Sequence, residues 1–200
     1  MIVLKDVSFQ YEGCEEGVHG IDLTVCDGEC VVLTGPSGGG KTTLTRLLNG
    51  LAPSYYQGTK KGDLWINDTE IASLPAWKIG QEIGSVFQDP KSQFFSSELA
   101  GEVAFACENY GMAKQEIRKR TDEAIVSMGL ETLRARPLDV LSSGEKQRVA
   151  VASVYALRPH TYVCDEPTAN LDSEGATRLA GILRKLKDEG NTLIIAEHRL

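Results

Sequence analysis

Residues 35–43, which read Gly-Pro-Ser-Gly-Gly-Gly-Lys-Thr-Thr, constrain the fold of this chain more than any other segment. The apolar run 30–34 before them predicts a buried strand, and residues 42–49 after them predict a helix that stops at Gly50. A strand, a glycine-rich loop and a helix in this order form a P-loop, in which backbone N–H groups and the helix N-terminus bind a polyphosphate. A flexible glycine turn is the alternative, but such a turn would need neither the strand nor the helix.

The residue types in this loop suit a nucleotide and its metal ion. Lys41 can place its charge between the β- and γ-phosphates, and the Thr42 hydroxyl can bind Mg²⁺. The candidate nucleotide-binding residues are Gly35, Pro36, Ser37, Gly38, Gly39, Gly40, Lys41, Thr42 and Thr43. We therefore expect a nucleotide and Mg²⁺ at this loop.

Two acidic residues follow another predicted strand. The short apolar run 161–164 ends in Asp165 and Glu166, so both carboxylates emerge at the carboxyl end of a buried strand. Ligands bind at this end of the strands in open α/β sheets. Asp165 suits the ligand shell of the metal, and Glu166 could accept a proton from an attacking water. An exposed acidic turn is the alternative for the pair taken alone.

A third segment predicts another contact with phosphate. Residues 141–148, Leu-Ser-Ser-Gly-Glu-Lys-Gln-Arg, open a helical stretch that must end near Arg158 because Pro159 follows. Ser142 and Glu145 have the spacing of a capping box. A helix start carries free N–H donors, so it can bind a phosphate that lies outside its own segment. An ordinary helix cap is the alternative.

In their order along the chain, these segments resemble the motifs of the nucleotide-binding subunit of an ABC-type ATPase. The P-loop corresponds to Walker A, residues 162–165 to the end of Walker B, and residues 141–145 to the signature segment. The family signature usually reads Leu-Ser-Gly-Gly-Gln, whereas this chain has Ser143 and Glu145 in place of the first Gly and the Gln. Ser143 conflicts with the motif only if its φ is positive, and Glu145 adds a negative charge close to a γ-phosphate.

Four further positions carry the same resemblance. Gln88 is similar to the Q-loop glutamine, residues 170–172 to the D-loop, and His198 to the switch histidine. Tyr11 lies 24 positions before Gly35 and matches the aromatic residue that stacks on adenine. The motifs extend from Tyr11 to His198 and so cover nearly the whole chain.

The resemblance implies an α/β fold of the P-loop NTPase (RecA-like) type. We expect a mostly parallel core sheet, an N-terminal antiparallel β subdomain and an inserted helical subdomain. Residues 1–200 would form a single ABC ATPase domain, with 1–90 and 155–200 as the nucleotide-binding core and 91–154 as the helical insert. The chain stops two residues after His198, where the family continues with further strands and helices, so we expect a truncated or minimal domain.

The resemblance also implies ATP hydrolysis by two subunits that enclose the nucleotide, with ATP and Mg²⁺ as cofactors. The signature helix of one subunit would complete the site of the other. On this basis the catalytic residues are Lys41, Gln88, Glu166 and His198; the metal-binding residues are Thr42, Gln88 and Asp165; and the additional nucleotide-binding residues are Tyr11, Ser142, Ser143 and Gly144.

Residues 86–95 and 102–111 are similar, more narrowly, to the ATPases of energy-coupling factor transporters, which take up a vitamin or a metal ion. The partners implied are a second ATPase subunit, in a homo- or heterodimer, a transmembrane coupling subunit and a small substrate-binding membrane subunit. Phe94 and Phe95 follow the paired glutamines Gln88 and Gln93. Both rings could be buried core, but an exposed ring would form part of a groove for a helix of the coupling subunit.

Composition limits the partners. The formal net charge is −7 and no basic tract compensates for it, so we expect no nucleic-acid partner. No run of 18 apolar residues and no signal-peptide pattern occurs, and the five cysteines form no Cys-x-x-Cys pair. We therefore expect a cytoplasmic chain, held at the inner face of the membrane by a partner. Two alternatives are an ABC ATPase that acts on nucleic acid or the ribosome, and a P-loop kinase or nucleotide sensor, which would leave Gln88 and the signature unexplained.

Overall fold

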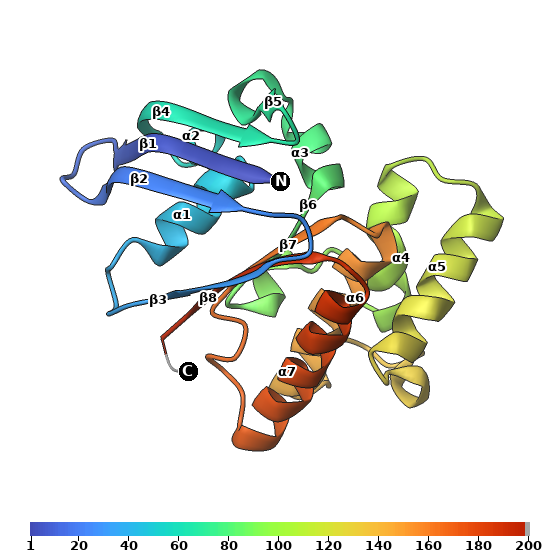
Figure 1. The fold of residues 1–200 in the computed structure, drawn as a ribbon. Helices are drawn as coiled ribbons and strands as arrows, with labels where there is room; N and C mark the ends of the chain where they lie inside the picture. The colour runs from blue at the N-terminus through green and yellow to red at the C-terminus, as the bar shows by residue number, and fades with distance from the viewer. Residues whose placement is uncertain (199–200) are drawn as a thin grey trace. The chain divides into compact units, whose positions relative to one another are not determined.

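The computed structural model describes residues 1–198, and they divide into two compact units (Figure 1). The first unit contains Met1–Ser85, His160–Asp165 and the residues from Leu186 on, and the second contains Val86–Pro159 and Glu166–Lys185. The chain crosses between them at the bond from Asp165 to Glu166, so two neighbouring candidate site residues belong to different units.

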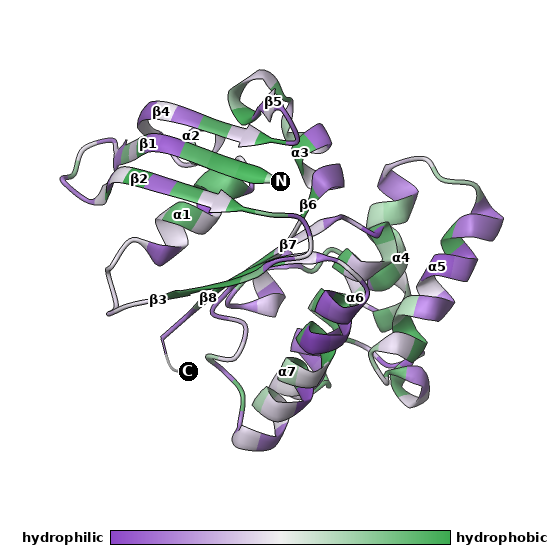
Figure 2. Cartoon of the chain, viewed as in Figure 1, coloured by the Kyte–Doolittle hydropathy of each residue, from purple (hydrophilic) through white to green (hydrophobic). Residues whose placement is uncertain are grey.

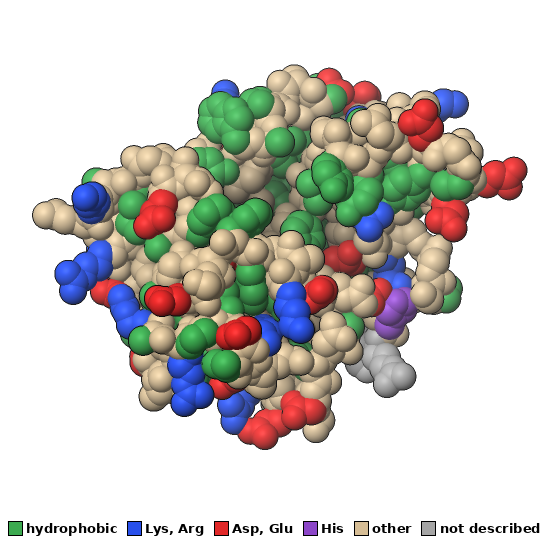
Figure 3. All heavy atoms as spheres, turned by 180° about the vertical axis from the view of Figure 1, so that it is seen from behind, with side chains coloured by type: hydrophobic (Ala, Val, Ile, Leu, Met, Phe, Trp, Pro, Cys, Tyr) green, Lys and Arg blue, Asp and Glu red, His purple; other side chains and the backbone are tan. Residues whose placement is uncertain are grey.

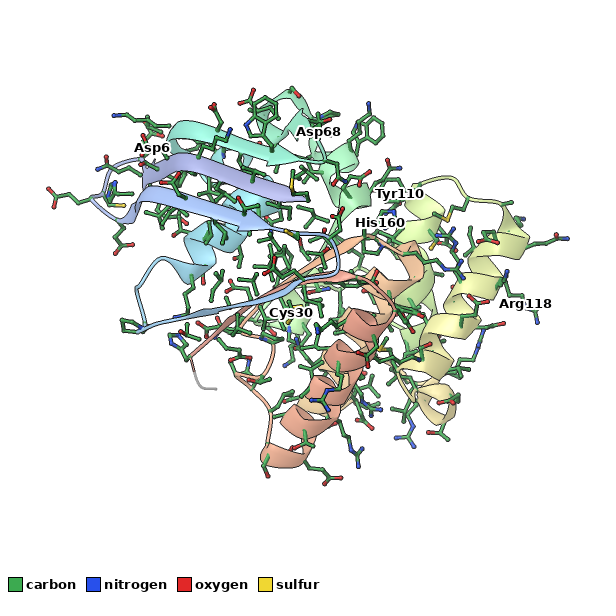
Figure 4. All side chains as sticks on the ribbon, in the orientation of Figure 1. Asp6, Cys30, Asp68, Tyr110, Arg118 and His160 are labelled. Carbon is green, nitrogen blue, oxygen red and sulfur yellow. The ribbon has the colours of Figure 1, made fainter. Side chains whose placement is uncertain are left out.

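The first unit begins with an antiparallel sheet of four strands in the order β2-β1-β4-β5. Its strands are β1 (Ile2–Tyr11), β2 (Gly17–Val25), β4 (Gly58–Ile66) and β5 (Thr69–Glu70). The buried side chains of β1 occupy even-numbered positions at its start, Ile2 and Leu4, and odd-numbered positions further on, Val7 and Phe9. A register shift between Leu4 and Val7, with a positive φ at Asp6, inserts the extra residue that makes this change possible (Figure 4). The bulge keeps one face of the strand in the core along its whole length.

The second sheet has the strand order β3-β8-β7-β6. Its strands are β3 (Cys30–Thr34), β6 (Ile83–Val86), β7 (Thr161–Asp165) and β8 (Thr192–Glu197), and β8 pairs in parallel with both β3 and β7. Every residue of β7 is buried, as expected for an inner strand of a parallel sheet. Figure 2 shows β3 and β8 as mostly hydrophobic ribbons. The expected combination of an antiparallel sheet and a parallel P-loop core sheet is therefore confirmed.

Short helices join these strands within the first unit. They are α1 (Lys41–Leu48), α2 (Leu51–Ser54), a 3₁₀ turn at Ile71–Ser73 and α3 (Ala76–Glu82). Helix α1 buries Leu44, Leu47 and Leu48 in the core that it shares with β1 and β4, and it also contacts β7. The packing of α1 fixes the P-loop, which immediately precedes it, to the end of the parallel sheet.

The second unit is mostly helical. It contains α4 (Leu99–Asn109), α5 (Lys114–Ser127), α6 (Ser143–Leu157) and 3₁₀ turns at Pro90–Gln93 and Glu131–Leu133, and α7 (Ser173–Asp188) crosses into the first unit at Leu186. Helices α4, α5 and α6 pack against one another. Arg120 on α5 donates hydrogen bonds to the carbonyl oxygens of Ala156 and Leu157, 3.4 and 3.2 Å away, and so satisfies the last turn of α6.

Candidate active site

The P-loop has the backbone that a phosphate cradle requires. Gly35, Gly38 and Gly40 have φ angles of 153°, 75° and 82°, values that residues with side chains rarely adopt. A Cβ atom on Gly40 would lie 2.5 Å from Cγ1 of Val18. Gly40 is also the N-cap of α1, and no side chain forms a capping hydrogen bond there. The first N–H groups of α1 and the loop therefore suit a polyphosphate, in agreement with the donor set predicted from the sequence.

Lys41 lies inside this loop. Its side chain is buried, and Nζ donates hydrogen bonds to the carbonyl oxygens of Gly35 and Pro36 at 2.9 and 3.0 Å. Nζ is also 3.1 Å from Nδ1 of His198, and that ring nitrogen is 3.2 Å from the Gly35 oxygen. An ammonium group can only donate, so a hydrogen bond from Lys41 to Nδ1 requires the tautomer with its proton on Nε2, whereas a bond from Nδ1 to the Gly35 oxygen requires a proton on Nδ1. The structure thus brings the predicted switch histidine next to the predicted P-loop lysine.

Thr42 and Asp165 form a second contact at the same end of the parallel sheet. Oγ1 of Thr42 donates to Oδ1 of Asp165 at 3.2 Å. Asp165 is the last residue of β7 and pairs with Ala196 of β8. The two oxygen atoms come from separate elements, and a hydroxyl with a carboxylate is a ligand set that Mg²⁺ favours. The residues present therefore fit the expected metal ion.

Tyr11 ends β1 and is tied to the helix that follows the P-loop. Its hydroxyl lies 3.2 Å from Oγ1 of Thr43, to which it donates, and accepts a hydrogen bond from Nη1 of Arg46 at 2.9 Å. The ring is partly exposed. The residue predicted to stack on adenine is therefore attached to α1, the helix that also carries Lys41 and Thr42.

In the second unit, Gln88 and Glu166 are in contact. Nε2 of Gln88 donates to Oε2 of Glu166 at 3.1 Å, and Glu166 is buried. Glu166 has a φ of 45°, a conformation that costs a non-glycine residue about 1–3 kcal/mol and that is frequent at functional sites. Its carbonyl oxygen accepts the N–H of Ala169, which closes the turn. The structure therefore joins the predicted Q-loop glutamine to the predicted general base.

Two side-chain amides that the sequence analysis assigned no such role hold the backbone around Gln88. Oε1 of Gln93 accepts the N–H of Phe87 at 3.1 Å, and Nδ2 of Asn170 donates to the carbonyl oxygen of Gln88 at 3.3 Å. The two glutamines Gln88 and Gln93 are close together in the sequence. The contact of Asn170 with Gln88 joins residues 82 positions apart, so sequence spacing could not predict it. These amides keep the main chain on either side of the Gln88 side chain in place.

The signature segment forms the capping box that its spacing predicted. Ser142 is the N-cap of α6, and its hydroxyl accepts the Glu145 N–H at 3.3 Å. Oε2 of Glu145 accepts the Ser142 N–H at 2.7 Å and the Ser142 hydroxyl at 2.8 Å. These two bonds, the backbone one first, hold the pKa of the Glu145 carboxyl below its usual value. Ser143 is the first residue of α6 and is not among the residues with positive φ, so a serine is accommodated there.

The predicted site residues fall into two groups, one in each unit. The first unit holds Tyr11, the P-loop residues 35–43, Asp165 and His198; the second holds Gln88, Ser142, Ser143, Gly144 and Glu166. Within the second unit, a cavity of about 430 Å³ lies between the start of α6 and the D-loop, and it is lined by Ser142, Ser143, Gly144, Leu171 and Asp172, among others. The signature residues are thus exposed to a cavity rather than buried by their own unit.

Comparison with known proteins agrees with this geometry. The family model described as ABC transporter matches residues 18–169. An ABC transporter ATP-binding protein of Treponema denticola is 40% identical over 201 residues; the alignment covers 100% of this chain but only 41% of that relative. The chain therefore spans less than half the length of this relative.

Two solved structures are also similar. One is cbiO1 of Clostridium perfringens, part of the ABC transporter complex cbiONQ, with a TM-score of 0.87, 33% identity, and coverage of 99% of this chain and 78% of that one. The other is the ATP-binding cassette MJ0796, a dimer bound to ADP and Pi, with a TM-score of 0.84, 28% identity, and coverage of 100% of this chain and 88% of that one.

Across residues 1–198, no helix is both long enough and apolar enough to cross a bilayer.

Proposed function

The chain belongs to the ABC transporter family of ATP-binding domains, and we propose that it hydrolyses ATP to power an energy-coupling factor transporter that takes up a vitamin or a metal ion. The observation that carries the hydrolytic part is the contact between Thr42 and Asp165 beside the buried Lys41. The observation that favours the transporter class is the likeness to cbiO1, part of a membrane transport complex.

The first unit supplies the groups that bind the phosphates. MgATP, when bound, supplies the phosphoanhydride bond to be cleaved and the positive charge of the metal. The loop N–H groups and Lys41 Nζ bind and orient phosphate oxygens, and Oγ1 of Thr42 with the carboxylate of Asp165 provides hard oxygen ligands. His198 Nδ1, beside Lys41, adds a polar contact at the same end of the sheet.

The second unit supplies the proton acceptor. The carboxylate of Glu166 takes a proton from the attacking water, and Gln88 Nε2 orients that carboxylate by donating to Oε2. The hydrogen bond from Gln88 and the strained backbone turn at Glu166 together support this position of the carboxylate. Gln88 is also proposed as a ligand of the metal.

A second subunit completes each site in this proposal. The hydroxyl of Ser142 and the N–H groups at the start of α6 line a cavity and would bind a phosphate held by the partner. The similar cassette MJ0796 is dimeric. The second subunit is either another copy of this chain or a related ATPase chain.

The surface around Phe95 is the proposed docking site for the membrane coupling subunit. Phe95 is 73% exposed and stacks on Phe105, with ring centroids 4.8 Å apart. The partly buried Phe94 lines a groove of about 520 Å³ together with Pro137 and Leu138. Figure 3 shows hydrophobic side chains at several places on the face seen from behind, interspersed with charged ones. Of the two rings, Phe95 is therefore exposed, and its role as an anchor for a helix is part of the proposal.

Purification of the tagged chain from detergent-solubilised cells tests the transporter class. We expect a hydrophobic membrane protein to copurify, and Phe95→Ala and Phe94→Ala to weaken this association without changing ATP binding. Val126→Ala, at a residue that is 59% exposed in the same unit, is the matched control and should behave like wild type. Recovery of ribosomes or nucleic acid in place of a membrane protein would contradict the proposal and support the other ABC class.

A further inference from the structure

Tyr11 belongs to a cluster of aromatic rings in the first unit. Tyr56, which follows α2, lies edge to face with Tyr11, with ring centroids 6.5 Å apart and planes at 87°. Tyr55 packs on Tyr56 in the same manner at 5.1 Å, but it is 74% exposed. Phe9, from the core side, contacts Tyr11 at 4.9 Å. The ring of Tyr11 is therefore held by neighbours from two different segments of the chain.

Arg46 is the centre of this cluster. Its guanidinium carbon lies 3.9 Å from the centroid of the Tyr56 ring, a close cation–π contact. Its Nη1 donates to the hydroxyl of Tyr11 at 2.9 Å. One planar side chain therefore stacks on one tyrosine and hydrogen-bonds the other, which a lysine could not do in the same way. Arg46 lies on α1, so the cluster is anchored to the helix that follows the P-loop.

A cavity of about 680 Å³ lies beside this cluster. Tyr11 lines it together with the turn after β1 and the start of β4, through residues 12–15 and 57–59. The N–H of Glu12 donates to the carbonyl oxygen of Gln57 at 3.0 Å and so joins these two walls. Tyr56 immediately precedes the second wall. The segment that packs on Tyr11 therefore also shapes the cavity.

We propose that Arg46 and Tyr56 are positioning residues for nucleotide-base binding: they hold the Tyr11 ring in the orientation in which it stacks on adenine. This inference rests on the proposed function, because it takes Tyr11 as the base-stacking residue. It adds that base binding requires a side chain of α1 and a side chain of the segment after α2. Neither residue touches the phosphates, so their loss weakens binding of the base and leaves the phosphate cradle intact.

Binding of two ligands to the full chain separates these contributions. Calorimetry with MgATP reports on base and phosphate together, and calorimetry with magnesium tripolyphosphate reports on the phosphate cradle alone. Arg46→Ala and Tyr56→Ala should each raise the Kd for MgATP about five- to tenfold, the scale of a partly buried cation–π contact or a charged hydrogen bond, and leave the Kd for tripolyphosphate within twofold. Turnover at saturating MgATP should remain at the wild-type level.

Conservative variants show that positioning, rather than general packing, is responsible. Tyr56→Phe keeps the ring under Arg46 and should bind MgATP like wild type. Arg46→Lys keeps the charge but loses the planar stack on Tyr56, so it should bind MgATP about as weakly as Arg46→Ala. It also replaces Arg46→Ala as the test if the alanine variant is unstable. Tyr55→Ala, next to Tyr56 but mostly exposed, is the control and should stay within twofold of wild type for both ligands.

Tyr11→Ala distinguishes failure of this inference from failure of the proposed function. If Tyr11→Ala weakens MgATP binding while Arg46→Ala and Tyr56→Ala do not, the positioning role is wrong and the base-stacking role of Tyr11 stands. If Tyr11→Ala has no effect, the base-stacking role is wrong and the inference fails with it. Equal weakening of MgATP and tripolyphosphate in Arg46→Ala and Arg46→Lys would also overturn it, because the effect would then arise from a distorted P-loop.

Discussion

Replacement of Glu166 by glutamine isolates proton transfer from every other role of that side chain. Gln88 Nε2 donates to Oε2 of Glu166 at 3.1 Å, and an amide oxygen in the same place can still accept that bond, although more weakly than a carboxylate. The glutamine has nearly the same shape, so the buried position is filled as before. The substitution removes the negative charge and with it the ability to take a proton.

The expected cost follows from that difference. A positioned general base contributes about 10²–10⁴ in rate, or about 2.7–5.5 kcal/mol in the barrier. Gln88→Ala, in contrast, leaves the carboxylate and removes one orienting hydrogen bond. The net value of a hydrogen bond to a charged group is about 1.5–3 kcal/mol, so this variant should lose about 13–160-fold. Glu166→Gln should therefore be the slower of the two.

Steady-state ATP turnover of the two variants and of the double variant, with the full pair of subunits present, is the assay. MgATP binding should stay near wild type in Glu166→Gln, and ATP should trap it as a dimer, detectable by size-exclusion chromatography. In the Glu166→Gln background, Gln88→Ala should lose only what its proposed metal contact contributes, because the carboxylate that it orients is already gone. Near-wild-type turnover of Glu166→Gln, or full additivity of the two losses, would refute the assignment.

Three further predictions concern the remaining parts of the chain. Lys41→Ala should weaken nucleotide binding in its own chain, whereas Ser142→Arg should leave nucleotide binding by the monomer intact and block the ATP-dependent dimer. In a homodimer, mixing the two variants should restore part of the ATPase activity. No recovery at any mixing ratio would argue against sites shared between subunits. Glu145→Gln should lower the midpoint of urea unfolding at pH 7 but not near pH 3, because a carboxyl whose pKa is lowered on folding stabilises above its unfolded pKa of about 4.3 and loses that contribution as the pH falls through its folded value. Cys164, whose pKa burial raises to about 12, should resist alkylation at pH 8 until the chain is unfolded, while the exposed Cys14 reacts at once; equal rates in the mass spectrum would contradict the buried strand.

Much of the fold could be predicted from local patterns. The strand before Gly35, the helix after Gly40 and the capping box at Ser142 each depend on residues close together in the sequence, and all three are present. The prediction that the strand is buried is wrong: β3 lies at the end of the strand order, and its residues are partly buried or exposed. The extended apolar run of β7 identified a buried strand because no polar residue interrupts it. Periodicity and capping carry information wherever the partner of a residue lies within one or two turns.

Contacts between distant segments could not be predicted in this way. Arg46 has the appearance of an exposed helix residue, yet it stacks on Tyr56 and bonds to Tyr11. Arg120 belongs to a charged run typical of a solvated face, yet it caps α6. These contacts depend on how elements pack, and neither hydrophobic period nor residue spacing records them. The catalytic roles of Gln88 and His198 stay predictions. Gln88 contacts Glu166, and His198 lies beside Lys41.

The pairing of β7 with β8 has a consequence for which length changes the chain can tolerate. Asp165 stands opposite Ala196, and each residue of β7 back to Thr161 has one fixed partner. Deleting a single residue from this strand would move Glu166 into the place of Asp165. Every side chain between the deletion and Glu166 would then point to the opposite face of the sheet. The turn between β1 and β2 has no such strand register, although it lines the cavity beside Tyr11. Across natural variants of this chain, changes of length should therefore be rarer in β7 than in that turn.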